Sequence, residues 1–481
     1  MMITEPLWSA GEIARAVAGR TAGRWLADGV AIDSREVIPG DLFVALPGTQ
    51  RDGHAFVAEA LEAGAAGALV SARDLAGIAT DDPRLVGVDD TATAFRALAT
   101  AARQRMSGRV AAVTGSAGKT SVKEALCRAL GRDALAHASA LSYNNHVGVP
   151  LSLARMPRGT RYAVFELGMS AAGEIAPLSR LVAPDVAIVT TVGSAHAAAF
   201  ADDRAIAAAK AEIFDGMSAG GIAVLNLDHE HAPWLVAQAR ERGLELLTVS
   251  LASEEADVRP LRLKRTVELS CMTADVAGVL ATVKVGAPGR HWVTNALLVL
   301  AAVRALDGDL GLAGLSLAEL QAPAGRGRHC PVPVRDGSFL VIDDAYNANP
   351  LSLAAALEAL ADIPTTPSGR RFAVLADMRE LGPRGGDLHR ALAPQLRAAR
   401  LTEVIAVGPQ MRLLAETAGV PVTTADDAAT ALAETRKRVR AGDVVLVKGA
   451  NAARLHIVVE GLLRLAQAPR PHAHRAGLAA E

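Results

Sequence analysis

A short segment of the chain, VAAVTGSAGKTS at residues 110–121, has the residue types and spacing of a phosphate-binding loop. Gly115 and Gly118 let backbone N–H groups turn towards phosphate oxygens, and the start of the helix that follows adds a favourable dipole. Lys119 can bridge the β- and γ-phosphates of a nucleotide, and the Thr120 hydroxyl can bind Mg²⁺. The alternative is a structural turn, because the segment lacks the first glycine of the longer GxxxxGK[ST] pattern. We expect a nucleotide to contact Gly115, Ser116, Ala117, Gly118, Lys119, Thr120 and Ser121.

Three further side chains stand where chemistry at a phosphate would need charge. Glu166 ends an apolar stretch, and a carboxylate at the end of a buried strand is costly unless it is paired or binds a metal. A helix cap or an ion pair is the alternative for Glu166. His196 lies in a loop after another apolar stretch, and Lys210 lies on a predicted helix. Such residues are usually exposed to solvent, so the residues alone leave the roles of His196 and Lys210 open.

Several amide, carboxylate and guanidinium side chains could also contact a ligand. Asn144 and Asn145 form a polar loop that could touch substrate or simply turn the chain. Asp343 and Asn347 lie in IDDAYNANP, where a predicted strand ends, and a capped turn is the alternative there. Arg326 stands at a predicted hinge, where a guanidinium suits bidentate contact with phosphate, although a solvated linker charge is equally compatible with the sequence.

Strands and helices alternate along three stretches of the chain, which predicts parallel sheets covered by helices on both faces. Predicted strands cover residues 41–46, 68–70, 85–88, 110–113, 162–167, 185–191, 222–226, 339–343, 372–375, 404–407 and 444–447. Residues 258–285 have a β-like pattern, and a helix is predicted over residues 388–399. At about 150 residues per domain, 481 residues suggest about three domains. We therefore expect an α/β protein with domains at 1–106, 107–322 and 323–481 and a disordered tail from residue 468.

Composition excludes several classes of protein. Hydrophobic residues make up 51% of the chain, and 50 Lys and Arg residues face 51 Asp and Glu residues, which excludes a disordered chain and a globally basic nucleic-acid binder. The three cysteines lack metal-binding or paired spacing. No signal peptide and no apolar stretch long enough to span a membrane is visible. We expect a soluble, cytoplasmic, monomeric protein that acts on small molecules, with no nucleic-acid partner and no membrane insertion.

The phosphate loop and several later segments resemble the Mur ligase superfamily, ATP-dependent enzymes that form amide bonds. The matching segments include SYNNHVGVPLS, FELGMSAAGEI, AKAEIF, IDDAYNANP and LADMRELG. The N-terminal DSREVIPGDLFVALPG is similar to the uridine-nucleotide domain of the superfamily, and the likeness covers about residues 33–450 in order. The resemblance implies three domains, with a central sheet like that of P-loop ATPases and a C-terminal Rossmann-like domain.

The resemblance also implies roles for residues in this sequence. It implies ATP and Mg²⁺ as cofactors, with Thr120, Glu166 and His196 as metal ligands. Lys210 matches a lysine that is often carbamylated in related ligases, so the implied catalytic residues are Lys119, Glu166, His196 and Lys210. Asn295, Arg326, Asp343 and Asn347 are expected to contact the nucleotide, and Ser34, Arg35, Asn144 and Asn145 the second substrate. Lys448 is expected to line either the amino-substrate side or the closed interface.

Within the superfamily, the motifs look like those of enzymes that add D-alanyl-D-alanine to UDP-N-acetylmuramoyl-tripeptide through an acyl phosphate. A ligase that adds the third amino acid of the peptide is an alternative, but the DNPR motif typical of that enzyme is absent from the sequence. A scaffold that has lost its chemistry is another alternative. A decayed site should have lost at least one of Glu166, His196 and Lys210, and all three are present.

Overall fold

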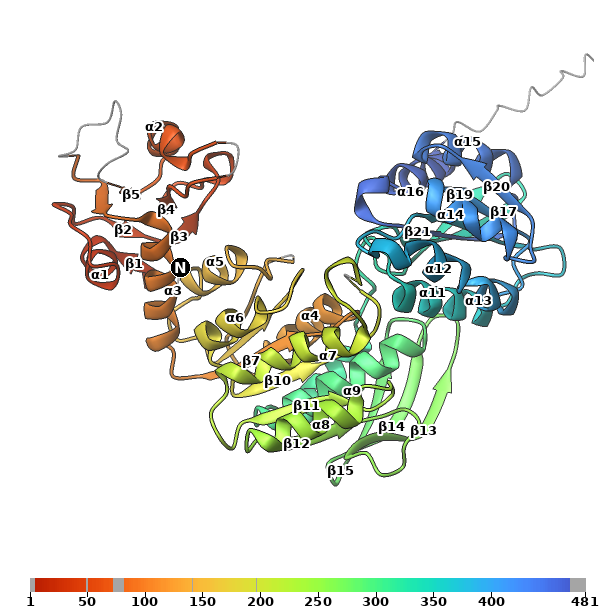
Figure 1. The fold of residues 1–481 in the computed structure, drawn as a ribbon, viewed down its shortest axis with the longest axis horizontal. Coiled ribbons are helices and arrows are strands. Elements are labelled where there is room, and N and C mark those ends of the chain that lie inside the picture. Colours follow the sequence, from red (N-terminus) through yellow and green to blue (C-terminus); the bar gives the residue numbers. More distant parts are fainter. Residues whose placement is uncertain (1–4, 49–50, 72–81, 141, 196, 468–481) are drawn as a thin grey trace, which may run out of the picture.

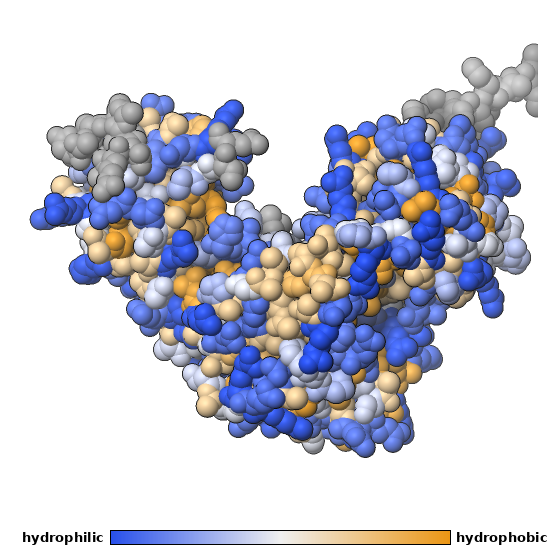
Figure 2. All heavy atoms as spheres, viewed as in Figure 1, coloured by the Kyte–Doolittle hydropathy of each residue, from blue (hydrophilic) through white to orange (hydrophobic). Residues whose placement is uncertain are grey.

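The computed structural model describes residues 5–48, 51–71, 82–140, 142–195 and 197–467. Its helices and strands form a U, with the N-terminal elements in one arm, the C-terminal elements in the other and a large sheet at the base (Figure 1). The space-filling view shows a wide hollow between the arms on this face (Figure 2). Among the helices that the structure describes, none is long and apolar enough to cross a membrane.

The N-terminal arm contains a four-stranded parallel sheet in the order β3-β4-β5-β6. Its strands are β3 (Gly29–Ala31), β4 (Asp41–Val44), β5 (Gly67–Ser71) and β6 (Leu85–Val88). A two-stranded antiparallel ribbon, β1 (Trp8–Ser9) and β2 (Leu26–Ala27), lies beside α1 (Ala10–Ala16). Helix α2 (Val57–Glu62) packs on β4 and β5, and α3 (Thr91–Gln104) leads towards the base of the U.

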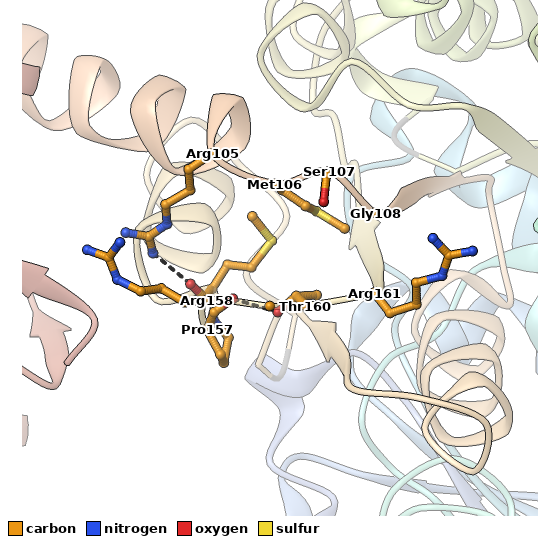
Figure 3. A pocket seen from close by; sticks show the side chains of 10 residues that line it. Arg105, Met106, Ser107, Gly108, Pro157, Arg158, Thr160 and Arg161 are labelled. Carbon is orange, nitrogen blue, oxygen red and sulfur yellow. Dashed lines mark hydrogen bonds between the residues drawn. The ribbon is translucent and has the colours of Figure 1, made fainter. Parts of the chain in front are cut away.

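Arg105, which follows α3, forms hydrogen bonds to both the N-terminal arm and the base. Its guanidinium donates hydrogen bonds to the carbonyl oxygens of Leu7, at 2.9 Å, and Met156, at 2.8 Å. The same group lies 4.0 Å from the centre of the Trp8 ring, an arrangement that attracts a cation. Arg158 lies beside Arg105 at a small cavity in this junction (Figure 3). Burial, and then the charge of Arg158, lower the pKa of Arg105 to about 10.

The base of the U is a nine-stranded sheet in the order β15-β14-β13-β12-β11-β10-β7-β9-β8. Its strands are β7 (Arg109–Thr114), β8 (Ala136–Ala138), β9 (Tyr162–Glu166), β10 (Val186–Val189), β11 (Ile222–Asn226), β12 (Glu245–Val249), β13 (Val258–Arg265), β14 (Ser270–Val276) and β15 (Val279–Val285). Buried residues of α4 (Lys119–Leu130), α9 (Arg290–Ala305) and α10 (Leu310–Ala318) cover one face. The other face packs against α3, α5 (Gly148–Ala154), α6 (Ile175–Val182), α7 (Asp203–Ala211) and α8 (Ala232–Glu241).

The C-terminal arm contains a six-stranded sheet in the order β16-β17-β21-β18-β19-β20. Its strands are β16 (Arg328–Val334), β17 (Gly337–Asp344), β18 (Arg371–Ala376), β19 (Glu403–Val407), β20 (Val422–Ala425) and β21 (Val444–Lys448). Helices α11 (Pro350–Asp362), α12 (Gly385–Arg390), α13 (Ala393–Ala398) and α14 (Pro409–Arg412) lie on one face, and α15 (Ala428–Arg438) and α16 (His456–Leu463) on the other. In Figure 1, α11 and α13 are the helices that face the base.

The predicted α/β fold class and the predicted strands are confirmed, with strand ends that differ by at most two residues. The continuous helix predicted over residues 388–399 is wrong. The chain breaks between α12 and α13, because Pro394 stands at the start of α13 and lacks the N–H that a continuing helix would need. The base sheet is also not wholly parallel, since β13, β14 and β15 pair antiparallel at one edge. The predicted disordered tail lies outside the described residues.

Candidate functional site

The phosphate-binding loop lies at the carboxyl edge of the base sheet, where β7 ends and α4 begins. Its two glycines have positive φ angles, 151° at Gly115 and 84° at Gly118, a region that favours glycine. Ser116 fixes the loop, because its N–H donates to the Thr191 carbonyl at 2.8 Å and its hydroxyl donates to the Gly193 carbonyl at 2.9 Å. Within the described residues, the N–H groups of residues 117 and 118 have no acceptor. They are therefore available to an anion.

We expect Gly115→Ala to destabilise the protein by about 1–3 kcal/mol and to weaken ADP binding. A Cβ at Gly115 would lie only 1.9 Å from Thr190 Oγ1, and the Thr190 hydroxyl is itself held by the Ala117 carbonyl at 2.5 Å. Urea unfolding and a titration with ADP measure the two effects. Gly278→Ala is a matched control, because Gly278 has a φ of 83° but open space around it. Equal losses in the two variants would show that the clash is unimportant.

Glu166 stands directly beside the loop. It is almost completely buried, with 1% of its surface exposed. Its carboxylate accepts hydrogen bonds from the Thr120 hydroxyl and from the Asn144 amide, each at 2.8 Å. The folded chain thus brings together three predicted site residues from α4, from the loop before α5 and from the end of β9. Their oxygens are hard ligands of the kind that Mg²⁺ prefers.

Two lysines share this region. Lys119 donates to the Gly115 carbonyl at 2.7 Å, and burial lowers its pKa, with Arg326 acting in the same direction and Glu166 opposing them. Lys210 on α7 is only 2% exposed. Burial, and then repulsion from Lys119, hold the pKa of Lys210 well below its usual range. No hydrogen bond or ion pair joins the Lys210 side chain to another described residue. This buried lysine is therefore unlike the solvated helix lysine that the sequence alone would favour.

A crevice of about 1020 Å³ opens from the loop towards the C-terminal arm. Loop residues 116–121 line it, and so do α11 and the start of α9. Six other predicted site residues also line the crevice: Asn144, Glu166, Asn295, Arg326, Asn347 and Lys448. Asn295 lies against the loop, with Oδ1 3.0 Å from the position of a Cβ on Gly118. The loop and these side chains form one continuous surface.

The C-terminal arm meets the base at the hinge and at the loop. The Arg326 guanidinium lies 4.2 Å from the centre of the Tyr346 ring, and the Tyr346 hydroxyl donates to Ser142 at 3.1 Å. At the start of α11, the Asn349 amide donates to the Ser116 carbonyl at 2.9 Å. These contacts place the arm directly against the phosphate-binding loop.

Two predicted ligand-binding residues have other partners in this structure. Asp343 accepts the Gly325 N–H at 2.8 Å and lies 3.7 Å from Arg328, so its carboxylate secures the hinge and does not line the crevice. The Asn145 side chain accepts the N–H groups of Val147 and Gly148, at 3.1 and 2.9 Å. The Asn145 side chain therefore holds the turn that leads into α5, which is the turn-forming alternative for this loop.

Ser34, Arg35 and Lys210 are not among the residues that line the crevice. Ser34 and Arg35 lie in the N-terminal arm, where the Arg35 guanidinium bonds to the Asp33 carboxylate at 2.5 Å. The Arg35 side chain and backbone N–H hold the pKa of Asp33 at about 2. His196 lies outside the described residues. The described part of the chain contains no cluster of three His, Cys, Asp or Glu side chains arranged to hold a metal.

Sequence reasoning missed two charged or titratable groups of the crevice. Asp344 lies 2.7 Å from Lys448, and burial raises its pKa while Lys448 opposes the shift. Burial, and then Lys448 and His329, lower the pKa of His291 to about 4. The available signal was the position of Asp344 and Lys448 at the ends of strands β17 and β21. That signal becomes decisive only when these strands are known to be neighbours.

The sequence matches three family profiles in order along the chain. They are described as Mur ligase family, catalytic domain (residues 27–109), Mur ligase middle domain (113–303) and Mur ligase, glutamate ligase domain (328–451). UDP-N-acetylmuramoyl-tripeptide–D-alanyl-D-alanine ligase of Escherichia coli is 36% identical over 90% of this chain and 93% of its own length. The enzyme of the same name from Bacillus subtilis is 31% identical, with the same coverage.

Solved structures agree with the sequence matches. A crystal structure of MurF from Acinetobacter baumannii aligns with a TM-score of 0.83 and 27% identity, over 96% of this chain and 99% of that one. MurF ligase from Thermotoga maritima, solved in complex with ADP, aligns with a TM-score of 0.76 and 29% identity, over 91% of this chain and 98% of that one. The chain belongs to the Mur ligase family, within which it resembles the UDP-N-acetylmuramoyl-tripeptide–D-alanyl-D-alanine ligases along nearly its whole length.

Proposed function

We propose that this chain is a ligase that joins D-alanyl-D-alanine to UDP-N-acetylmuramoyl-tripeptide and converts ATP to ADP and phosphate. The names of its relatives from E. coli and B. subtilis support the choice of substrates. The observation within the chain that carries the proposal is the crevice, where Lys119, Thr120 and Glu166 face the C-terminal arm across a space large enough for a nucleotide. The relative from T. maritima was solved with ADP.

The reaction needs activation because a carboxylate is a poor electrophile at neutral pH. In the proposed first step, a carboxylate oxygen of the tripeptide bonds to the γ-phosphorus while the bond to the β-phosphate oxygen breaks. The amine of D-alanyl-D-alanine then attacks the acyl carbon, loses a proton and displaces inorganic phosphate. Lys119 and the free N–H groups of residues 117 and 118 would stabilise the charge that develops on the phosphate oxygens. Closure of the crevice would exclude water, which would otherwise hydrolyse the acyl phosphate.

The residues beside the loop fit a magnesium ion. Thr120 Oγ1 and Glu166 Oε2 lie 2.8 Å apart, and both are hard oxygen donors of the type that Mg²⁺ binds. When bound, Mg²⁺ would supply positive charge to the phosphates. We assign Thr120 and Glu166 to hold it, with His196 as a further ligand. Burial lowers the pKa of Lys210, and its amine would be the group that reacts with CO₂ to give the carbamate implied by the family likeness.

We assign the three parts of the molecule to different ligands. Ser34 and Arg35 in the N-terminal arm would bind the uridine nucleotide, together with Asn144 beside Glu166. Asn295, Arg326 and Asn347 would contact ATP in the crevice. The C-terminal arm would bind the dipeptide and close over the reacting groups, and the protein would work as a monomer.

Omission of each substrate in turn tests the proposed function. We expect phosphate release from ATP to require UDP-N-acetylmuramoyl-tripeptide and D-alanyl-D-alanine together. The tripeptide supplies the carboxylate that forms the acyl phosphate, and the amine of the dipeptide displaces phosphate from it. A coupled phosphate assay and mass spectrometry of the nucleotide product measure this. Equal phosphate release without D-alanyl-D-alanine would overturn the assignment. Turnover with a single amino acid and a UDP-linked substrate that carries only two amino acids would overturn it as well.

A further inference from the structure

Asn349 performs two tasks with the two ends of one amide. The side-chain Oδ1 accepts the Ser352 N–H at 2.8 Å, and the backbone N–H of Asn349 donates to the Ser352 hydroxyl at 3.0 Å. These two bonds cap the start of α11. The side-chain Nδ2 of Asn349 donates to the Ser116 carbonyl at 2.9 Å. The cap is local to the C-terminal arm, whereas the second bond reaches across to the phosphate-binding loop of the base.

The bond to Ser116 fixes the orientation of the Ser116–Ala117 peptide. In a trans peptide, the carbonyl oxygen of one residue and the N–H of the next point in opposite directions. When Asn349 holds the Ser116 carbonyl, the Ala117 N–H is therefore directed to the other side of the loop. That N–H has no acceptor among the described residues, and residues 116–121 line the crevice.

The turn that carries Asn349 is fixed within the C-terminal arm. Lys448 donates to the Asn347 carbonyl at 2.9 Å and lies 2.7 Å from Asp344. Next to this turn, Leu351 packs on the loop after β10, with Cδ1 2.6 Å from the position of a Cβ on Gly193. A rotation of the arm would therefore move Asn349 with it and release the Ser116 carbonyl.

We propose that Asn349 is a positioning residue that couples the orientation of the C-terminal arm to the phosphate-binding geometry of the loop. It holds the Ser116–Ala117 peptide so that the Ala117 N–H points to the nucleotide phosphates. The inference rests on the proposed function in that the anion is taken to be the phosphate chain of ATP or ADP. In this proposal Asn349 acts through Ser116 and does not itself touch the phosphates. Replacement of Asn349 should therefore weaken nucleotide binding through loss of the bond to Ser116. The cap of α11 should remain wherever the new side chain can still accept a hydrogen bond.

The test compares ADP binding by the full-length wild type, Asn349→Asp and Asn349→Ser with Mg²⁺ present. Aspartate and serine both serve as N-caps, but the carboxylate has no hydrogen to donate and the serine hydroxyl is too short to reach the base. We expect both variants to bind ADP about three- to tenfold more weakly, which is the loss of one hydrogen bond. The KM for ATP should rise by a similar factor, with the KM for D-alanyl-D-alanine and the melting temperature unchanged.

Asp427→Asn is the matched control. Asp427 caps α15 in the same arm through the Thr430 N–H at 2.7 Å, so this exchange of cap residues should leave ADP affinity unchanged. Wild-type ADP affinity in both Asn349 variants would overturn the inference. Weaker ADP binding in Asn349→Asp alone would also overturn the inference, because the added negative charge would then explain the effect. A wild-type protein that binds no ADP would instead overturn the proposed function.

Discussion

Replacement of Lys119 by alanine should lower turnover by about a thousandfold, the loss typical of removing a group that stabilises transition-state charge. Lys119 is the first residue of α4, where a positive charge is unfavourable, and burial already lowers its pKa. Among the described residues, the one hydrogen bond of its ammonium group is to the Gly115 carbonyl of the same loop. The free energy of unfolding should therefore stay the same or increase, so the effect on turnover would be purely functional.

The rate of phosphate release and a urea unfolding curve measure the two quantities for Lys119→Ala. Lys284→Ala is the matched control, because Lys284 lies exposed on β15, far along the sheet order from the loop. The control should retain full activity. Turnover close to wild type in Lys119→Ala would remove the phosphate-binding role of the loop.

The second large effect is expected for Glu166→Gln, which should lower turnover by about a hundredfold or more and raise the Mg²⁺ concentration needed for half-maximal rate. Glutamine keeps the shape of the side chain and one oxygen, and the Thr120 hydroxyl can rotate to accept from the new amide. The remaining oxygen can still accept from Asn144, and Thr120 becomes the acceptor of the new amide, so both partners keep a hydrogen bond to residue 166. The fold should survive, while the affinity for a divalent cation falls.

A titration of the rate with Mg²⁺ separates this effect from simple damage. Glu245→Gln is a suitable control, because Glu245 is exposed at the start of β12 on the same sheet and should not change the titration. If Glu166→Gln showed the wild-type Mg²⁺ dependence, Glu166 would be a structural partner of Thr120 and Asn144 and not a metal ligand.

Local features of the site could be predicted because they depend on neighbours in sequence. The strand β7, the two glycines and the start of α4 lie within one short segment, and the apolar runs that form the parallel strands are nearly continuous. Glu166 could be placed at the active edge because the carboxyl ends of parallel strands meet there. The family likeness implied that Glu166 and Thr120 share a metal ion. The residues alone did not predict their contact, since it depends on the order of β7 and β9 in the sheet.

Choices between adjacent residues were beyond the sequence. Successive residues of a strand point to opposite faces, so only one of Asp343 and Asp344 can face the crevice, and the structure gives that place to Asp344. In the loop before α5, Asn144 reaches Glu166 while its neighbour Asn145 holds the turn that leads into the helix. The bond from Asn349 to Ser116 spans 233 positions and depends on how two parts of the molecule meet. The domain limits and the site roles remain predictions.

The arms of the U differ in how they are joined to the base. One apolar core runs without interruption from Trp8, Val44 and Phe95 in the N-terminal arm to Phe165 and Ile206 in the base. The C-terminal arm has its own two cores, to which the base contributes little beyond Ala197 and Val267. We therefore expect the first two parts to unfold together as one cooperative unit. We expect the C-terminal arm to open locally without exposing the core of the base.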